Sequence, residues 1–337
     1  MTLAHRLHDW FVKNQRDLPW RRTRDPYAIW LSEIMLQQTR VTAVIPYYER
    51  FLERFPTYEE LAAASESELL AMWSGLGYYS RARNLQKAAR LMVEMGGFPS
   101  TYEEIHELPG VGDYTAAAVA SIAFGLPRVG LDGNIVRVMA RWTAEPGDVK
   151  TFTIRARLQQ VAQNQMDTRD PGTYKQALME LGATICLPKA PKCLYCPINE
   201  DCGAKLQGLQ HTIPIQLGKA TQISEERTIL WICRGEKVLL WQRPLDSKRL
   251  AGFWELPEPE KITQVKILGN LGEFSHSIVN HKYRIILREA KLQGGTGDLC
   301  QWVRLDQLKD LPISTVLRKS LRILKLDPRR ERNEGVS

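Results

Sequence analysis

The chain has 337 residues, a length that predicts two or three domains, and 44% of them are hydrophobic, which allows a sizeable core. Six cysteines in a chain this long exclude a small disulfide scaffold, so clustered cysteines indicate metal binding or redox chemistry. The net charge of +8 suits a polyanion such as nucleic acid, although a basic solvated surface without a partner fits equally well.

The N-terminal segment MTLAHRLHDWFVKNQ is amphipathic and carries polar residues throughout, unlike a secretory signal peptide. No apolar run in the sequence is long enough to span a bilayer. We therefore expect an intracellular protein without a membrane partner, which in a prokaryotic cell is cytoplasmic and associated with the nucleoid.

The first 200 residues have apolar positions at three- and four-residue spacing, which is the period of amphipathic helices. Asp25 followed by Pro26 predicts a helix start, because the carboxylate caps free N–H groups and proline lacks the N–H that the first turn leaves unpaired. A helix is expected to end at Gly96, with Ser100 or Thr101 capping the next one.

The character of the sequence changes after Cys202. The segment 203–222 has little periodicity and is rich in Gly and Gln, which is typical of a linker. Apolar runs on both sides of residues 234–237 predict a β-hairpin, further strand patterns follow, and Ser314 is expected to cap a returning helix. The predicted organisation is a helical region at 1–202, a linker at 203–222, a β-rich domain at 223–326 and a disordered tail at 327–337.

Two glycines mark the sharpest local motif, LPGVGDYTAAAVASIAF. Gly110 and Gly112 flank Val111 directly before a helical pattern, so the backbone can turn tightly and bring its N–H groups close to a ligand. Together with the positive end of the helix dipole, these donors form an anion site suited to a DNA phosphate. An ordinary corner between two helices that needs small residues fits the same pattern.

Two carboxylates stand out beside this motif. Asp132 precedes a helical pattern, where it suits either an N-cap or a functional carboxylate at a helix mouth. Glu33 lies in the apolar run WLSEIML, where partial burial would raise its pKa and suit it to general-acid chemistry. A surface glutamate on an amphipathic helix is the ordinary alternative.

Four cysteines lie within one short loop, separated by six, two and five residues: Cys186, Cys193, Cys196 and Cys202. This spacing suits either an iron–sulfur cluster or a structural zinc ion. Cys233 and Cys300 fall in the β-rich region and are predicted to be core thiols.

These motifs, in this order, resemble the helix-hairpin-helix DNA glycosylases and, among them, the adenine DNA glycosylase family. The resemblance covers roughly residues 5–205 and continues in the C-terminal domain. It implies an all-helical core followed by a Nudix-like α/β/α domain; within the core, a six-helix part spans about 25–131, and the N-terminus joins about 132–202 in a second part. It also implies that the four cysteines ligate a structural [4Fe–4S] cluster, whose loop presents Lys189 and Lys192 to DNA.

The resemblance assigns chemistry to four residues. An enzyme that acts on a base first extrudes it from the duplex, and cleavage of a glycosidic bond uses two carboxylates. By resemblance, Glu33 protonates adenine, Asp132 stabilises the cationic sugar, and Asn134 helps to position them. Tyr114 stands where bifunctional relatives place a Schiff-base lysine. A monofunctional enzyme that leaves an abasic site is therefore expected.

The resemblance also implies DNA contacts. Gln38 and Tyr78 match residues that wedge into the base stack. Asp113 stands where relatives often carry a basic residue, so it should weaken DNA contact slightly unless it is paired. Further matches are the phosphate-binding hairpin Gly110, Val111 and Gly112, the adenine pocket Trp20, Arg21, Leu36 and Glu180, and an 8-oxoguanine reader formed by Phe274, Ser275 and His276.

The sequence thus predicts a monomeric adenine glycosylase acting on double-stranded DNA that carries adenine opposite 8-oxoguanine or guanine. No REXXEE pattern follows GFWELP, so the C-terminal domain is expected to recognise its target without hydrolysing nucleotides. One alternative is an endonuclease III-like glycosylase with lyase activity, against which Tyr114 argues. Others are a DNA-binding iron–sulfur protein without catalysis, against which Glu33 and Asp132 argue, and an electron carrier.

Overall fold

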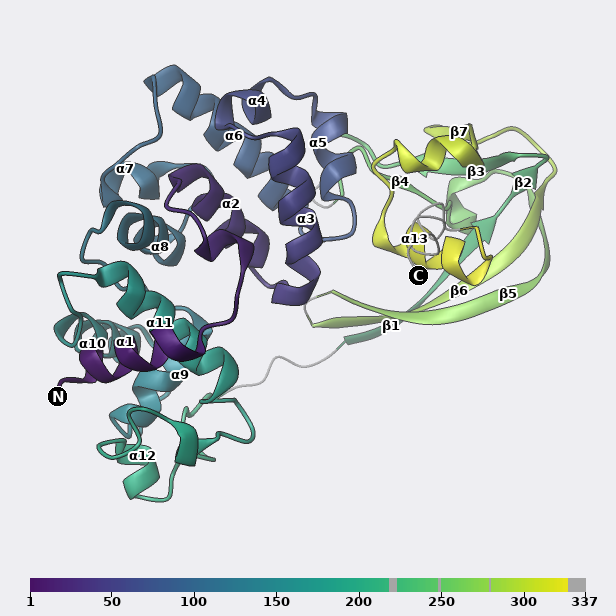
Figure 1. The fold of residues 1–337 in the computed structure, drawn as a ribbon. Helices are drawn as coiled ribbons and strands as arrows, with labels where there is room; N and C mark the ends of the chain where they lie inside the picture. The colour runs from purple at the N-terminus through teal and green to yellow at the C-terminus, as the bar shows by residue number, and fades with distance from the viewer. Residues whose placement is uncertain (218–222, 248–249, 279, 327–337) are drawn as a thin grey trace, which may run out of the picture. The chain divides into compact units, whose positions relative to one another are not determined.

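The computed structural model describes residues 1–217, 223–247, 250–278 and 280–326. The chain divides into two compact units, of which the first contains Met1–Ala63 with Arg83–Lys219 and the second contains Ala64–Ala82 with Ala220–Ser337. In the described residues the first unit is helical, and the second contains β-sheets (Figure 1). The predicted helical region followed by an α/β region is confirmed, and the predicted domain boundaries stay predictions.

Helix starts in the first unit follow local side-chain chemistry. Asp25 accepts hydrogen bonds from the backbone N–H groups of Tyr27 and Ala28, and Thr101 forms a capping box with Glu104. The helices are α1 (Leu3–Asn14), α2 (Pro26–Leu36), α3 (Val41–Arg54), α4 (Tyr58–Ala63), α6 (Ser80–Met95, which begins in the second unit), α7 (Tyr102–Glu107), α8 (Asp113–Phe124), α9 (Gly133–Trp142), α10 (Phe152–Asn164), α11 (Pro171–Thr184) and α12 (Gly203–Leu206), with 3₁₀ turns η1 (Pro19–Arg21) and η2 (Cys193–Tyr195).

Helices α2 and α8 form the centre of the first unit. Both are apolar on nearly all sides, and a helix of this kind is stable only when other elements cover it. They contact each other, and α11 contacts α8, α9 and α1. Side chains from α2, α8, α11 and the start of α9 therefore reach a common interior. Among the residues that the structure describes, no helix is both long and apolar enough to cross a bilayer.

The first part of the predicted linker packs on the first unit. Ala204 and Ile213 are buried in the core around α9 and α11, and the N–H of Val149 donates to the carbonyl of Ile215. These apolar side chains explain the packing, since their burial stabilises an otherwise aperiodic segment. Residues 218–222 of that linker, and the predicted tail at 327–337, lie outside the described residues.

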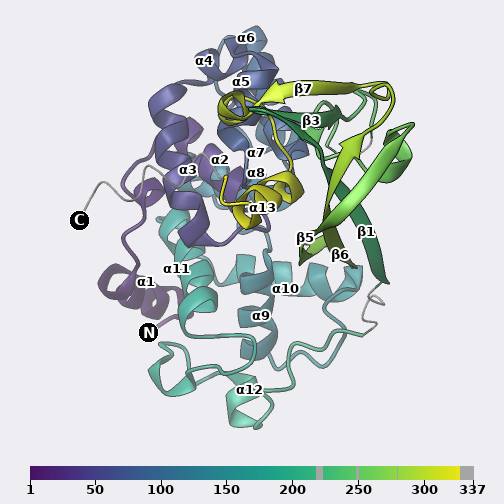
Figure 2. The same ribbon diagram turned by 90° about the vertical axis from the view of Figure 1, so that its right-hand side faces the viewer.

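The second unit is built from two sheets and a C-terminal helix. One sheet has the order β1-β6-β5, with β1 parallel to β6 and β5 antiparallel to it; in the other, β3 pairs with β2, β4 and β7. Helix α13 contacts β4 and β5 (Figure 2). The elements are α5 (Glu66–Trp73), β1 (Ile223–Trp231), β2 (Cys233–Arg234), β3 (Lys237–Gln242), β4 (Trp254–Glu255), η3 (Pro259–Lys261), β5 (Val265–Ile278), β6 (His281–Leu292), β7 (Cys300–Arg304), η4 (Leu305–Lys309) and α13 (Thr315–Ile323).

Local predictions for this unit hold at most positions. The predicted hairpin is β2–β3, the further strands are β6 and β7, and Ser314 caps α13 by accepting from the N–H of Leu317. Residues 64–82 join this unit, in which the Tyr79 ring lies 4.0 Å from that of Phe253. The prediction of a core thiol at Cys233 is wrong: this residue is exposed, because β2 has only two residues and ends in the hairpin turn.

Candidate active site

Glu33 is a buried carboxyl in the middle of α2, only 4% exposed. Burial raises its pKa, although the nearby ammonium of Lys175 and a hydrogen bond from the Tyr114 hydroxyl act in the opposite direction. The sequence prediction of burial is confirmed. A raised pKa favours the protonated carboxyl, which is the form that can donate a proton to a leaving base.

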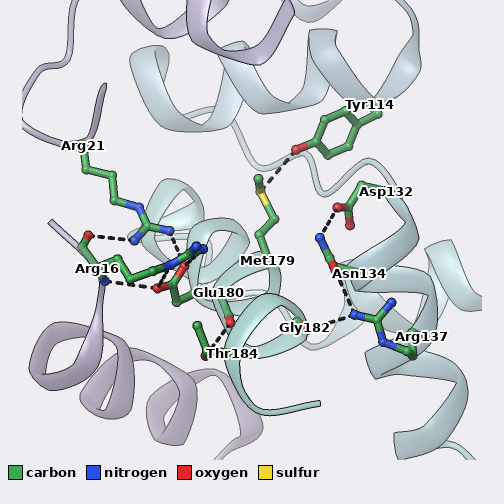
Figure 3. Close-up of polar contacts among 10 residues, drawn as sticks. All are labelled: Arg16, Arg21, Tyr114, Asp132, Asn134, Arg137, Met179, Glu180, Gly182 and Thr184. Atoms are coloured by element: carbon green, nitrogen blue, oxygen red, sulfur yellow. Dashed lines mark hydrogen bonds and ion pairs between the residues drawn. The ribbon is translucent and has the colours of Figure 1, made fainter. Parts of the chain in front are cut away.

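Tyr114 extends from α8 toward the same interior. Its hydroxyl is hydrogen-bonded to Glu33 and lies 3.3 Å from the sulfur of Met179 (Figure 3). Burial and the neighbouring carboxylates of Glu33 and Asp132 raise its pKa well above the ordinary value, so the phenol stays neutral. Tyr114 therefore places a neutral hydrogen-bond donor beside Glu33.

Asp132 acts as the N-cap of α9 and has both oxygens engaged. Oδ1 accepts from the N–H of Ile135 at 2.6 Å, and Oδ2 accepts from Nδ2 of Asn134 at 2.9 Å. Asp132 is half-buried, so it can face a substrate while the helix end holds it. The two roles that the sequence left open for Asp132, cap and functional carboxylate, are compatible.

Arg137 fixes the orientation of Asn134, and sequence reasoning did not identify it. Its guanidinium donates to Oδ1 of Asn134 and to the carbonyl of Gly182, both at 2.8 Å (Figure 3). It also donates to the carbonyl of Cys186 at 2.7 Å. Gly182 allows this approach, because a Cβ there would lie 2.5 Å from Cβ of Asn134. The amide beside Asp132 is thus tied to α11 and to the first cysteine of the loop.

Glu180 on α11 is the centre of a buried charge cluster. Its carboxylate accepts from Nε of Arg16 at 2.8 Å, from Nη2 of Arg16 at 2.7 Å and from Nη2 of Arg21 at 2.7 Å (Figure 3). Burial opposes ionisation, but the two arginines prevail and lower the pKa of Glu180 to about 2. The structure thus brings Arg21 and Glu180 together and adds Arg16, which sequence reasoning missed.

The other two predicted pocket residues lie in neighbouring elements. Trp20 in η1 is buried edge-on against the Tyr48 ring, with 5.4 Å between the centroids. Leu36 is half-buried in the last turn of α2. Their contact with adenine stays a prediction.

The glycine motif forms the hairpin between α7 and α8. Gly110 has a φ of +78°, and a Cβ there would lie 2.7 Å from the side chain of Asn84, so glycine is required twice over. Val111 is buried and donates its N–H to Leu108. Gly112 is the N-cap of α8 and supplies no side-chain cap, which leaves this helix start suited to an anion.

Asp113 is paired. Its Oδ1 accepts from the hydroxyl of Tyr102 at 2.5 Å, and the guanidinium of Arg128 lies over the Tyr102 ring, 4.6 Å from its centroid. The Asp113 carboxylate beside the hairpin is therefore paired with the Tyr102 hydroxyl. This satisfies the condition under which its charge should not weaken phosphate binding.

The two predicted wedge residues share an unusual backbone conformation. Gln38 has a φ of +56° and Tyr78 a φ of +49°, and both side chains are exposed. Left-handed conformations are uncommon outside glycine and concentrate at functional positions, where the surrounding fold enforces them. Gln38 belongs to the first unit and Tyr78 to the second.

The four loop cysteines line one cavity, together with Arg141 and apolar side chains. Arg141 is buried and donates to Sγ of Cys186 at 3.3 Å and to the carbonyls of Leu187 and Pro188. Within the described ranges, no group of three or more His, Cys, Asp and Glu side chains converges on a single-ion position. The support for a metallocofactor is the shared cavity and its four thiols, and Lys189 and Lys192 are exposed on the same loop.

Phe274, Ser275 and His276 follow one another on β5. Phe274 packs against the core of the second unit, and Lys319 of α13 donates to the carbonyl of Ser275 at 2.8 Å. Burial and the charge of Lys319 lower the pKa of His276, which favours the neutral imidazole. Phe274 and Ser275 also line an open hollow that Tyr283 shares. The three residues are thus adjacent to a polar surface, and their contact with a lesion stays a prediction.

The comparisons agree with this geometry. Residues 31–164 match the family described as HhH-GPD superfamily base excision DNA repair protein. A thermostable thymine-DNA glycosylase is 30% identical at a TM-score of 0.56, covering 60% of this chain and 95% of that one. A trapped endonuclease III–DNA covalent intermediate, 22% identical at a TM-score of 0.52 over 61% and 95%, shares the fold. The match to a base excision repair family and the similarity to a thymine-DNA glycosylase place the chain among the DNA glycosylases of base excision repair.

Two relatives narrow the class further. The adenine DNA glycosylase of Homo sapiens is 33% identical over 402 aligned residues, which cover 94% of this chain and 73% of the human protein. That of Buchnera aphidicola subsp. Acyrthosiphon pisum is 32% identical over 298 residues, covering 83% and 85%. The chain belongs to the adenine DNA glycosylase family, as its motifs predicted.

Proposed function

We propose that the protein is a monofunctional glycosylase that removes adenine opposite 8-oxoguanine or guanine in double-stranded DNA, acts as a monomer and leaves an abasic site. One observation supports this most directly. Glu33 is buried with a raised pKa and is hydrogen-bonded to the neutral hydroxyl of Tyr114, and the half-buried Asp132 is held at the start of α9 close enough to act electrostatically on both. This arrangement supplies an acid for the leaving base and a fixed negative charge for the sugar.

The chemistry divides between these groups. After the adenosine is flipped out, Glu33 protonates the adenine ring, and the weakened glycosidic bond breaks. Asp132, held by Asn134 and the start of α9, stabilises the cationic sugar until water adds to it. Tyr114 carries no amine, so it cannot form the Schiff base with which a bifunctional enzyme cleaves the strand.

The test is a single-turnover assay on a duplex with one adenine opposite 8-oxoguanine. Each time point is split, and one half is treated with hot alkali. Strand breakage only in the alkali-treated half is expected. Breakage without alkali would support the lyase alternative, and tight binding without base release would leave a recognition protein.

We also propose that Cys186, Cys193, Cys196 and Cys202 hold a [4Fe–4S] cluster. Such a cluster is ligated by four thiolates, and the four cysteines line one cavity. Its contribution would be structural, since it would brace the loop that bears Lys189 and Lys192.

Purified protein is expected to contain about four iron and four sulfide ions per chain. Cys196→Ala should lose most of both and bind duplex DNA more weakly, because the loop is no longer braced. Cys233→Ala, which removes an exposed thiol elsewhere, is the matched control and should retain both ions. Finding one zinc ion and no iron in the wild type would show that the four cysteines hold a structural zinc ion instead of a cluster.

The C-terminal unit is proposed to recognise 8-oxoguanine through Phe274, Ser275 and His276. His276→Ala should reduce the preference for adenine opposite 8-oxoguanine over adenine opposite guanine by about tenfold, because one specific polar contact discriminates by roughly 1–3 kcal/mol. Ser277→Ala, at the next exposed position of β5, should leave the preference unchanged. The preference is the ratio of the single-turnover rate constants on the two duplexes. If His276→Ala and Ser277→Ala have the same preference, His276 does not recognise 8-oxoguanine.

A further inference from the structure

Lys175 on α11 is fully buried, with 0% of its surface exposed, and nothing in the chemistry described so far uses it. A charged amine is costly to bury, so such a lysine is ordinarily compensated by negative groups. The sequence already indicated that this position is unusual. Lys175 shares a helix face with Leu178, Met179 and Gly182, and at such a position a helix that only packs would carry an apolar residue.

The surroundings of the amine are those of the active site. Nζ donates to the backbone carbonyl of Tyr114 at 3.1 Å and lies over the Tyr114 ring, 4.6 Å from its centroid. The charged groups that face it come from three other elements: Glu33 on α2, Asp113 on α8 and Asp132 at the start of α9. The amine thus contacts Tyr114 directly and acts electrostatically on Glu33 and Asp132, the two carboxyl groups to which the reaction is assigned.

We propose that Lys175 is a positioning residue of the glycosylase site, whose buried ammonium anchors Tyr114 and balances the negative charge of Glu33 and Asp132. The inference deepens the proposed function and rests on Glu33 as the acid. In this arrangement α11 supplies the floor of the site, and the amine acts through its neighbours without touching the substrate.

The charge balance changes during the reaction. Before proton transfer, burial favours the neutral Glu33; after it, Glu33 is a carboxylate beside Asp132, and two like charges at one site repel each other. A nearby ammonium stabilises the state after transfer and so makes Glu33 a stronger acid. Arg21 also favours the ionised form of Glu33, and it lies on η1, away from the Tyr114 ring.

The pH dependence follows with a definite sign. An acid works while protonated, so the rate falls as pH rises through the apparent pKa of the site. Burial lowers the pKa of Lys175 to about 7, although Glu33, Asp132 and Asp113 oppose that shift, so Lys175 and Glu33 titrate together. While Lys175 is protonated, its ammonium lowers the pKa of Glu33, and removal of the amine should let Glu33 keep its proton to higher pH. The alkaline limb of Lys175→Met should therefore move upward, while its plateau should fall because a weaker acid donates less readily.

The experiment measures single-turnover adenine release across pH 5 to 10 for wild type, Lys175→Met and Lys13→Met. Methionine has nearly the length of lysine without the charge. Lys13 is exposed near the end of α1, so Lys13→Met removes one positive charge from the surface only. Circular dichroism melting and iron content show that each variant is folded, and Glu33→Gln is run in parallel.

We expect Lys175→Met to be folded, about tenfold slower on its plateau, and shifted to higher pH on the alkaline side, with Lys13→Met matching the wild type. A folded Lys175→Met whose alkaline midpoint is unchanged or lower would overturn the charge balance. If Lys175→Met does not fold, Lys175→Gln is used instead, and the same upward shift of the alkaline midpoint is expected. Borohydride trapping of a protein–DNA adduct that Lys175→Met abolishes would make the amine a nucleophile and overturn the positioning role. If Glu33→Gln retains activity, Glu33 is not the acid and the proposed function is wrong. An unchanged pH profile of Lys175→Met together with an inactive Glu33→Gln would instead contradict the role of Lys175 alone.

Discussion

Replacing Glu33 with glutamine is expected to slow adenine release by about 10³-fold, within the range that general acid catalysis contributes. Glutamine keeps the size of the side chain and accepts a hydrogen bond from Tyr114, but it has no acidic proton to give to adenine. Glu33 is buried on α2, with 4% of its surface exposed, so a solvent water is poorly placed to donate the missing proton in its stead. Single-turnover rates with enzyme in excess measure this directly.

The matched control for Glu33→Gln is Glu53→Gln, which removes an exposed carboxylate from α3. It should release adenine at the wild-type rate. Binding to uncleaved duplex should be unchanged in both variants, so the loss belongs to the chemical step. A Glu33→Gln variant within tenfold of the wild type would transfer the acid role to another group.

Glu180→Gln is expected to destabilise the helical unit by about 3 kcal/mol, because removal of one partner leaves buried charge uncompensated. The carboxylate has 0% side-chain exposure and serves two guanidiniums, of which Arg21 is 9% exposed and Arg16 is 39% exposed. Arg16 can turn to water in the variant, whereas Arg21 is held between α1 and α11. Denaturant unfolding followed by circular dichroism gives the loss.

The pH dependence of this stabilisation has a clear sign. Glu180 has a pKa of about 2 in the folded chain, below the ordinary value of a glutamate. Its contribution is present at neutral pH, and it is lost as pH falls from about 4 toward 2, where the carboxylate takes up its proton. Wild type and Glu180→Gln should therefore differ at pH 7 and converge in acid.

The control for Glu180→Gln is Glu103→Gln, which breaks the exposed ion pair with Arg128. Exposed pairs of this kind contribute about 0–1 kcal/mol, so this variant should unfold nearly as the wild type does. Equal, small effects of both substitutions would show that burial of the Glu180 cluster adds no stability. If Glu180→Gln is destabilised but still releases adenine at the wild-type rate, Glu180 has a structural role and does not contribute to the predicted adenine pocket.

Features that depend on neighbours along the chain could be predicted from the sequence. Asp25, Thr101 and Ser314 cap helices as expected, because a cap is satisfied by N–H groups two or three residues away. The burial of Glu33 followed from the apolar residues around it on α2. Likewise, Gly110 in the hairpin indicated a tight turn before α8, since glycine fits a positive φ without strain.

Contacts between residues far apart in the chain could not be predicted and were found only in the folded structure. Arg16 and Glu180 are 164 positions apart, yet they share two side-chain hydrogen bonds. Arg137 reaches Cys186, and Lys175 reaches Tyr114, only because α9, α11 and α8 pack together. Local pattern carries no information on such pairs, since they form where helix packing brings distant positions together. Glu33 and Asp132 could be named as candidates from the sequence, whereas the charged groups that contact them or shift their electrostatics were found only in the fold.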